Sequence, residues 1–158
     1  MYPVEILYIK TINNFCNINS FFIFEILYEI KYILTKDFQI KAIYITSSLE
    51  KNDDQELELF TIPGNKIGKF KVFLKIRAPD YSSFRMEELT EVNVILLIFL
   101  YDNIELIRIG YYMNNEILFE NEMDLKNSPK IKSILRKILT DKPRITYFPF
   151  FSENIDSK

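Results

Sequence analysis

The 158-residue sequence has no histidine and no tryptophan, and it has only one cysteine and three glycines. Without histidine, the chain lacks the commonest general base and the commonest metal ligand. Cys16 has no second cysteine to pair with, which excludes an internal disulfide and indicates a reducing compartment such as the cytosol or nucleus. Gly64, Gly68 and Gly110 do not form a phosphate-binding loop. We therefore expect no enzymatic activity, no catalytic residue, no cofactor and no bound metal.

The net charge is also small, and long apolar runs are scarce. The formal net charge is −2, and the lysines stand singly between apolar positions instead of forming a stripe. We therefore expect no direct binding of nucleic acid or of an anionic membrane. The longest apolar run, residues 94–101, is too short to span a bilayer as a helix. A composition of 48% hydrophobic and 27% charged residues fits one globular domain with a sizeable core.

The segment 90–116 predicts two long strands joined by a tight turn at Asp102 and Asn103. Both faces of the first strand are apolar. The first face carries Val92, Val94, Leu96 and Ile98, and the second carries Ile95, Leu97 and Phe99. One face can supply a core. The other needs a cover, which another element of the chain or another protein would provide.

The rest of the chain also reads mainly as strands. β-branched and aromatic residues recur between polar turns at residues 4–12, 22–33, 38–46, 56–62, 68–77 and 144–150. Residues 84–89 suit one helical turn. A longer helix is predicted from Pro129 to about residue 140, because apolar residues repeat at three- and four-residue intervals (Ile131, Ile134, Leu135, Ile138 and Leu139).

The predicted fold is therefore all-β, an immunoglobulin-like β-sandwich with one short helix in its C-terminal half. We expect one domain over residues 1–151. Residues 152–158 are polar and are expected to form a short frayed tail.

Two candidate sites have simpler interpretations. An acidic cluster, made of Glu50, Asp53, Asp54, Glu56 and Glu58, has the residue types for hydrolysis or cation binding. Its spacing matches no calcium loop, and a solvated loop is the simpler interpretation. Cys16 has no evident activating cation in the sequence, so packing explains it better than nucleophilic catalysis.

The segment 107–116 (IRIGYYMNNE) permits two interpretations. It is either a core strand with Arg108 extending to solvent, or the centre of a binding surface. A single cation among apolar and aromatic side chains is typical of such a centre. The residue pattern alone leaves both interpretations open.

IRIGYYMNNE and the later run ILTDKPRITYF resemble the histone chaperone family named for anti-silencing function, whose members carry RVGYYVNNEY and PRVTRF runs. Shorter matches follow the same order: NN at 13–14, FEI at 24–26, YITSS at 44–48, DQEL at 54–57, AP at 78–79 and VNVILL at 92–97. The resemblance covers residues 1–150. It implies a non-catalytic nuclear chaperone with an immunoglobulin-like fold that binds the histone H3–H4 heterodimer. The family blocks pairing of two heterodimers into a tetramer and delivers histones for nucleosome assembly and disassembly. We expect a monomer.

The resemblance also implies three groups of site residues. The group for histone H3 has Val94 at its apolar centre and consists of Ser47, Ser48, Asp54, Val92, Val94, Leu96, Arg108 and Tyr112. The group to which the histone H4 tail would add as a strand consists of Tyr111, Pro143, Arg144, Ile145 and Thr146. The third group would receive basic peptides of the histone-regulator complex and of chromatin assembly factor, and it consists of Tyr28, Asp37, Phe38, Glu58, Phe60 and Ile62.

The sequence departs from the family pattern at two site positions. Tyr147 replaces a usual arginine, and Lys36 stands where glutamate is common, which weakens attraction to a basic peptide. These departures support an alternative hypothesis, an immunoglobulin-like interaction module with a non-histone partner. A third hypothesis is a hydrolase that uses Asp53 and Asp54, for which we expect no turnover.

Overall fold

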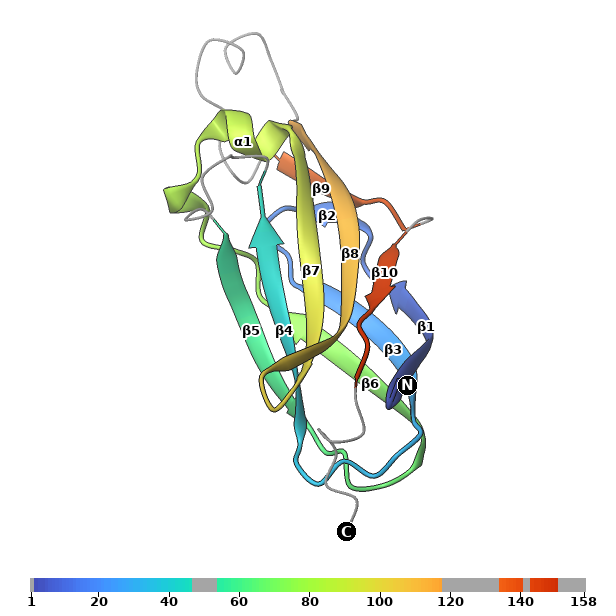
Figure 1. Cartoon of the computed structure of the whole chain (residues 1–158). Coiled ribbons are helices and arrows are strands. Elements are labelled where there is room, and N and C mark those ends of the chain that lie inside the picture. Colours follow the sequence, from blue (N-terminus) through green and yellow to red (C-terminus); the bar gives the residue numbers. More distant parts are fainter. Residues whose placement is uncertain (1, 47–53, 118–133, 141–142, 151–158) are drawn as a thin grey trace, which may run out of the picture.

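The computed structural model describes residues 2–46, 54–117, 134–140 and 143–150, and these form a sandwich of two antiparallel sheets (Figure 1). The strands are β1 (Val4–Thr11), β2 (Phe15–Asn17), β3 (Phe22–Ile30), β4 (Phe38–Ile45), β5 (Gln55–Ile62), β6 (Gly68–Ile76), β7 (Val92–Tyr101), β8 (Ile104–Ile117), β9 (Ile134–Ile138) and β10 (Arg144–Tyr147). A 3₁₀ turn, η2 (Tyr81–Ser83), and the helix α1 (Met86–Thr90) precede β7. The predicted all-β sandwich with one short helix is confirmed.

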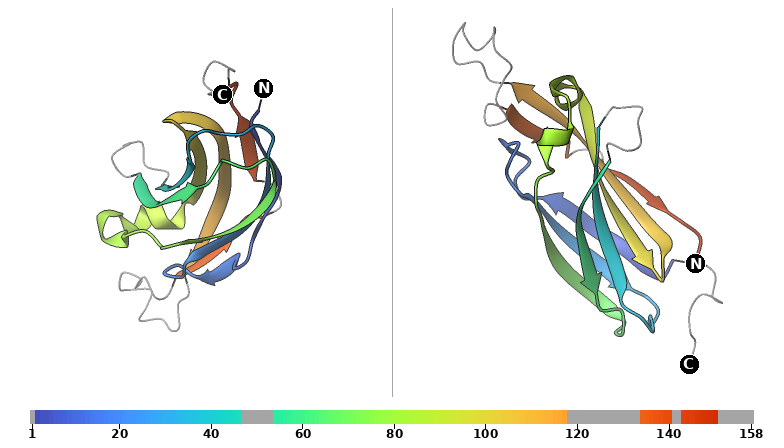
Figure 2. Two further views of the ribbon diagram at one scale, coloured as in Figure 1. Left: turned by 90° about the horizontal axis from the view of Figure 1, so that it is seen from below. Right: turned by 90° about the vertical axis from the view of Figure 1, so that its left-hand side faces the viewer.

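The two sheets differ in size. The smaller sheet has the order β1-β3-β6, and the larger has the order β2-β9-β8-β7-β4-β5, with β10 also paired to β8. β10 pairs with the first half of β8, and β9 pairs with the second half. Figure 2 shows that the sheets are strongly curled. β8 therefore lies at the centre of the larger sheet and joins the hairpin β7–β8 to the C-terminal strands.

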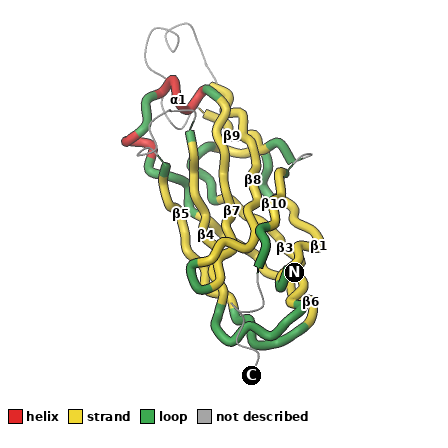
Figure 3. The backbone as a smooth tube through the Cα atoms, in the orientation of Figure 1, coloured by secondary structure: helices red, strands yellow, loops and turns green. Residues whose placement is uncertain are grey.

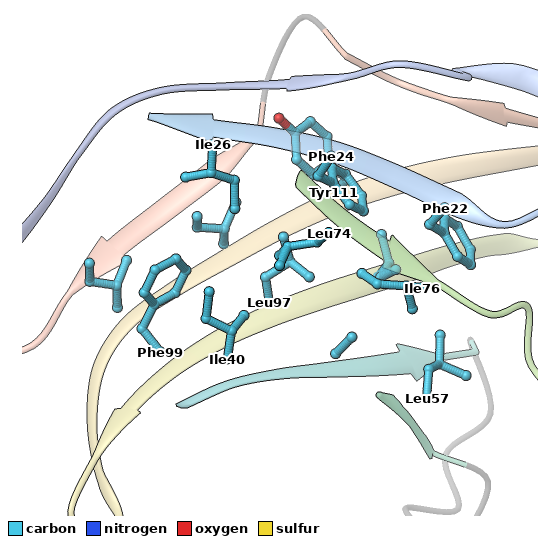
Figure 4. Packing of buried hydrophobic residues seen from close by; sticks show 14 of the residues in the cluster. Phe22, Phe24, Ile26, Ile40, Leu57, Leu74, Ile76, Leu97, Phe99 and Tyr111 are labelled. Carbon is cyan, nitrogen blue, oxygen red and sulfur yellow. The ribbon is translucent and has the colours of Figure 1, made fainter. Parts of the chain in front are cut away.

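The core lies between the inner faces of the two sheets, as the strand period of two requires. Phe22, Phe24 and Ile26 of β3 and Leu97 and Phe99 of β7 all point into the core between the sheets (Figure 4). All five side chains are fully buried. The two opposite faces predicted for β7 are confirmed.

The hairpin β7–β8 matches the predicted pair of long strands. Asp102 and Asn103 connect them with φ angles of 51° and 64°. Two successive residues in this left-handed region form the type of turn whose twist suits a hairpin, and aspartate and asparagine tolerate it best after glycine. The turn therefore fixes the register of the two strands.

The predicted helix from Pro129 to residue 140 is wrong where the structure describes it. Residues 134–138 form β9, and the helical segment is α1 (Figure 3). Residues 129–133 lie outside the described residues. Ile134, Arg136 and Ile138 all point inward, which is a period of two. An arginine at an inward position concealed this period in the sequence.

Buried Arg136 finds its partners on neighbouring segments. Its guanidinium carbon lies 3.7 Å from the centroid of the Phe22 ring, and its Nη atoms donate to the carbonyls of Ser20 and Phe21 at 2.8 and 3.0 Å. These contacts compensate the desolvation of the cation. In the part of the chain that the structure describes, no helix is long and apolar enough to cross a membrane.

Candidate functional site

A groove of about 360 Å³ opens on the outer face of the larger sheet, over β7, β8 and β10. Its lining residues are Val94, Leu96, Arg108, Gly110, Tyr112, Arg144, Thr146 and Phe148. The pairing of the strands brings these residues together, because Val94 lies opposite Tyr112 and Gly110 lies between Leu96 and Arg144. Segments separated by about fifty residues in the sequence thus form one continuous surface.

Gly110 forms the floor of the groove. A Cβ atom at this position would lie 3.2 Å from Cδ2 of Leu96 and 3.8 Å from Cγ1 of Val94. Because glycine has no side chain, Leu96 and Val94 border an open hollow at this position. Any larger residue would fill this hollow from below.

The apolar side chains of the groove remain accessible. Val94 and Leu96 are half-buried, and Tyr112 is 43% exposed. Val92 lies further along the same face of β7 and is 49% exposed, but it does not line the groove. No described element covers this face, so a second protein can reach it.

Arg108 supplies one of the two cations at the groove, and Arg144 supplies the other. Its Nε and Nη2 atoms donate to the two carboxylate oxygens of Glu105 at 2.7 and 3.1 Å. The guanidinium carbon also lies 5.9 Å from the ring centroid of Phe148. A bidentate pair and an aromatic neighbour hold the guanidinium in one orientation, while three of its five N–H donors stay outside the pair.

A bulge explains why Glu105 and Arg108 share a face although they are three residues apart. Phe99 of β7 pairs with Ile107, but the next residue, Leu100, pairs with Glu105. Leu106 is therefore the extra residue of β8, and the bulge reverses the alternation there. Both Leu106 and Ile107 are buried, as a bulge of this kind requires.

β10 forms one side of the groove and keeps an edge for pairing. Arg144 and Thr146 point into the groove, and Ile145 is 38% exposed. Among the described strands, only β8 pairs with β10. Pro143 is half-buried and directly precedes the strand. An edge strand of this kind can accept an added strand.

The backbone N–H of Ile6 in β1 donates to the Tyr147 hydroxyl at 2.9 Å, across the gap between the sheets. The rings of Tyr2 and Tyr147 lie 5.2 Å apart. Tyr147 therefore ties β10 to the smaller sheet. Burial raises the pKa of its hydroxyl, and the bond from Ile6 acts in the opposite direction.

Tyr111 and Asp54 of the two predicted histone-binding groups also lie away from the groove. Tyr111 differs from the expectation for a tail-contacting side chain: it is 1% exposed, and its ring packs 5.5 Å from that of Phe24 in the core. Burial raises the pKa of Tyr111 to about 12. Asp54 is exposed and directly precedes β5, two strands from Val94, which is roughly 10 Å at the usual strand spacing. Ser47 and Ser48 lie outside the described residues.

Half of the third predicted group is interior. Phe38 is fully buried, Tyr28 is 4% exposed, and their rings meet edge to face at 5.8 Å. Ile62 is 9% exposed and pairs with Phe38. A peptide would therefore meet only the accessible members of the group. These are Asp37, which is exposed, half-buried Phe60, and Glu58, which lies 3.5 Å from Nε of Arg77.

Three parts of the groove were not predicted as site residues. Gly110 forms the floor, Phe148 faces the guanidinium, and Glu105 orients it. The sequence could have indicated Gly110, because it is a glycine within an apolar strand and directly precedes two tyrosines. Glu105 could not, because its face depends on the bulge.

The acidic cluster gains no further support. Glu50 and Asp53 lie outside the described residues. Across the described ranges, no group of three or more cysteine, aspartate and glutamate side chains is arranged to hold a metal ion.

The described residues thus form a β-sandwich with an exposed, partly apolar groove beside a strand edge, features that are common in protein-binding domains. Comparison with known proteins specifies which kind. Residues 1–151 match the model of the family described as ASF1 like histone chaperone. The chain belongs to this family.

Individual relatives agree with the family model. The chain is 36% identical over 149 residues to Histone chaperone asf-1 of Neurospora crassa, covering 94% of this chain and 55% of that protein. It is 35% identical over 155 residues to Histone chaperone ASF1 of Saccharomyces cerevisiae, covering 96% of this chain and 54% of that protein. Histone chaperone ASF1B of Arabidopsis thaliana is 38% identical over 139 residues, covering 84% of this chain and 62% of that protein. The chain thus spans about half the length of the two fungal relatives.

Proposed function

We propose that this protein is a nuclear chaperone that binds the histone H3–H4 heterodimer in the groove over β7, β8 and β10. The observation that carries the proposal is the exposed hollow in which Val94, Leu96 and Tyr112 surround Gly110 beside an oriented Arg108. A helix can place an apolar face in such a groove. Because the same histone surface would otherwise pair two heterodimers, binding there would block tetramer formation.

Apolar and polar contacts in the groove would have different roles. Desolvation of Val94 and Leu96 would supply most of the affinity. The free donors of Arg108 would fix orientation, since charge pairs at interfaces set register and association rate more reliably than affinity. Asp54, at a distance from the groove, would meet a basic histone side chain.

The edge of β10 would receive the histone H4 tail as an added strand. Main-chain hydrogen bonds along residues 144–146 would supply affinity, and the exposed Ile145 side chain would help to set the register. The accessible Asp37, Glu58 and Phe60 would contact a basic peptide of a downstream chaperone. That chaperone would be the histone-regulator complex or chromatin assembly factor, and the transfer would serve nucleosome assembly and disassembly. No step in this function requires catalysis.

Co-elution tests the proposal directly. The purified protein, mixed with refolded H3–H4 at moderate salt, should give one gel-filtration peak. Light scattering should show one chaperone per heterodimer and no H3–H4 tetramer. Separate elution of the two components, or a complex that contains the tetramer, would contradict the proposal.

A non-histone partner is the second candidate, and the contacts of Lys36 and Tyr147 favour it. Lys36 lies 3.2 Å from Asp102, and Tyr147 is engaged by Ile6. Two positions that depart from the family pattern thus make contacts within this chain. Affinity capture from a nuclear extract distinguishes the candidates, because this alternative predicts enrichment of another protein without histones.

A further inference from the structure

The outer face of the smaller sheet gathers lysines that stand apart in the sequence. Lys69, Lys71 and Lys75 alternate with inward residues of β6, so the period of two places all three on one face. Phe73 lies between them on the same face. Lys10 of β1 joins this set, because it pairs with Glu25 of β3, and Glu25 pairs with Phe73.

Aromatic rings and ammonium groups on this face both reach solvent. Phe73 is 60% exposed, which is among the highest values for a large apolar side chain here, and Tyr8 is 37% exposed. The side chains of Lys10 and Lys71 are 64% and 48% exposed. Nζ of Lys75 lies 4.4 Å from the ring centroid of Phe21, which is itself 45% exposed.

Carboxylates balance this charge only in part. Glu25 lies beneath the lysines with its side chain 11% exposed, 3.5 Å from Nζ of Lys10 and 3.7 Å from Nζ of Lys71. The Tyr8 hydroxyl donates to Glu25 at 3.1 Å. Interaction with Tyr8 is the main cause that raises the pKa of Lys71, and the charge of Glu25 raises it further.

The far end of the face carries two further carboxylates, which neighbouring lysines oppose. Glu29 lies opposite Lys69 in the register, and Glu5 is paired with Lys31 at 2.6 Å. Each ammonium has three donors, so one contact with a carboxylate leaves others for a ligand. The lysines therefore remain able to bind an anion.

We propose that the outer face of the β1-β3-β6 sheet binds single-stranded nucleic acid. The phosphates would contact Lys69, Lys71 and Lys75, and an unpaired base would stack on Phe73. Successive outward side chains of β6, which are lysines and one phenylalanine, lie about 7 Å apart, twice the rise per strand residue. A nucleotide chain likewise repeats one phosphate and one flat base. A duplex hides its base faces and cannot use the ring.

This proposal is independent of histone binding, because the groove lies on the other sheet. If the proposal holds, net charge is a poor guide to this face. A chain with a net charge of −2 can still present a basic face when lysines fall at every second position of an exposed strand.

Fluorescence anisotropy of labelled oligo-dT with the full chain tests the proposal. We expect binding at about 50 mM salt that weakens at about 200 mM, with a log–log slope near −0.7 per lysine contact. Phe73→Ala should weaken binding roughly tenfold, and Phe73→Leu should not restore it, because leucine offers no ring for stacking. Lys71→Gln combined with Lys75→Gln should weaken binding and reduce the slope by about 1.4.

Lys66→Gln is the matched control, since Lys66 is exposed in the turn between β5 and β6 and should leave binding unchanged. Circular dichroism would verify that each variant is folded. No binding of oligo-dT at low salt would overturn the proposal, as would equal losses in the control and face variants. Equally tight binding of duplex DNA would contradict base stacking on Phe73, because charge alone would then explain the binding. Displacement by polyglutamate at matched charge would assign the face to an acidic peptide instead.

Discussion

The two faces of the β7–β8 hairpin carry similar residue types in opposite environments. Leu97 is fully buried against the smaller sheet, whereas its neighbour Leu96 is half-buried at the groove. Likewise, Tyr111 is 1% exposed and Tyr112 is 43% exposed. A strand that is apolar on both sides thus stabilises the fold with one face and offers the other to a partner. Matched substitutions in neighbouring residues can separate these two roles.

Leu97→Ala should have the largest effect on stability. Removing a fully buried leucine loses its transfer free energy and leaves a cavity, so the free energy of unfolding should fall by about 2–5 kcal/mol. Leu96→Ala should cost less than about 1 kcal/mol, because the groove side is already open to water. Urea denaturation of both variants measures the difference. Equal losses would mean that the two faces are packed alike.

Val94→Arg should have the largest effect on histone binding. The arginine can extend into water in the free protein, but a docked histone would bury its charge without a partner. We expect a loss of about 3 kcal/mol, which is more than roughly 100-fold in Kd. Stability should change little.

Leu59→Arg is the control for this charge. Leu59 is 48% exposed on the same sheet, outside the groove. Calorimetric titration of H3–H4 should give an unchanged Kd for this variant. If folded Val94→Arg bound histones as tightly as Leu59→Arg, Val94 would not lie at the centre of the interface.

The hairpin could be predicted from sequence because its signals are local. A period of two and an Asp-Asn turn specify both strands without knowledge of the rest of the fold. β9 could not be predicted in the same way. Ile134, Leu135 and Ile138 also fit a helical period, and the inward Arg136 donates hydrogen bonds to carbonyls more than a hundred residues away in sequence.

The candidate site shows the same division. Its residues on β7 and β8 follow from strand alternation together with the family resemblance. The roles of Glu105 and Phe148 depend instead on a bulge and on the crossing of β10, which no local pattern records. Tyr28 and Phe38 were expected at a peptide site, and the tertiary packing places them in the core.

Buried Tyr111 of β8 should make stability depend on pH in the alkaline range. Burial raises the pKa of Tyr111 from 10.0 to about 12, so the unfolded chain ionises first as pH rises. The stabilising contribution is complete below pH 10 and is lost between about pH 10 and 12, by on the order of 1–2 kcal/mol. Tyr111→Phe should reduce this alkaline loss, whereas Tyr112→Phe should retain it. Urea midpoints across this pH range would test the difference, and identical profiles would contradict it.

Tyr147→Phe should have the smallest effect on stability. It removes the hydroxyl through which Tyr147 ties β10 to the smaller sheet. Without the hydroxyl, the Ile6 N–H loses its acceptor, which should cost about 0.5–1.5 kcal/mol. Hydrogen exchange at the Ile6 amide should become faster. Thr146→Val is the control, since Thr146 points into the groove and not toward β1. Unchanged exchange at Ile6 would show that β10 is held by β8 alone. Faster exchange with unchanged histone affinity would show that the link stabilises the sandwich without shaping the groove.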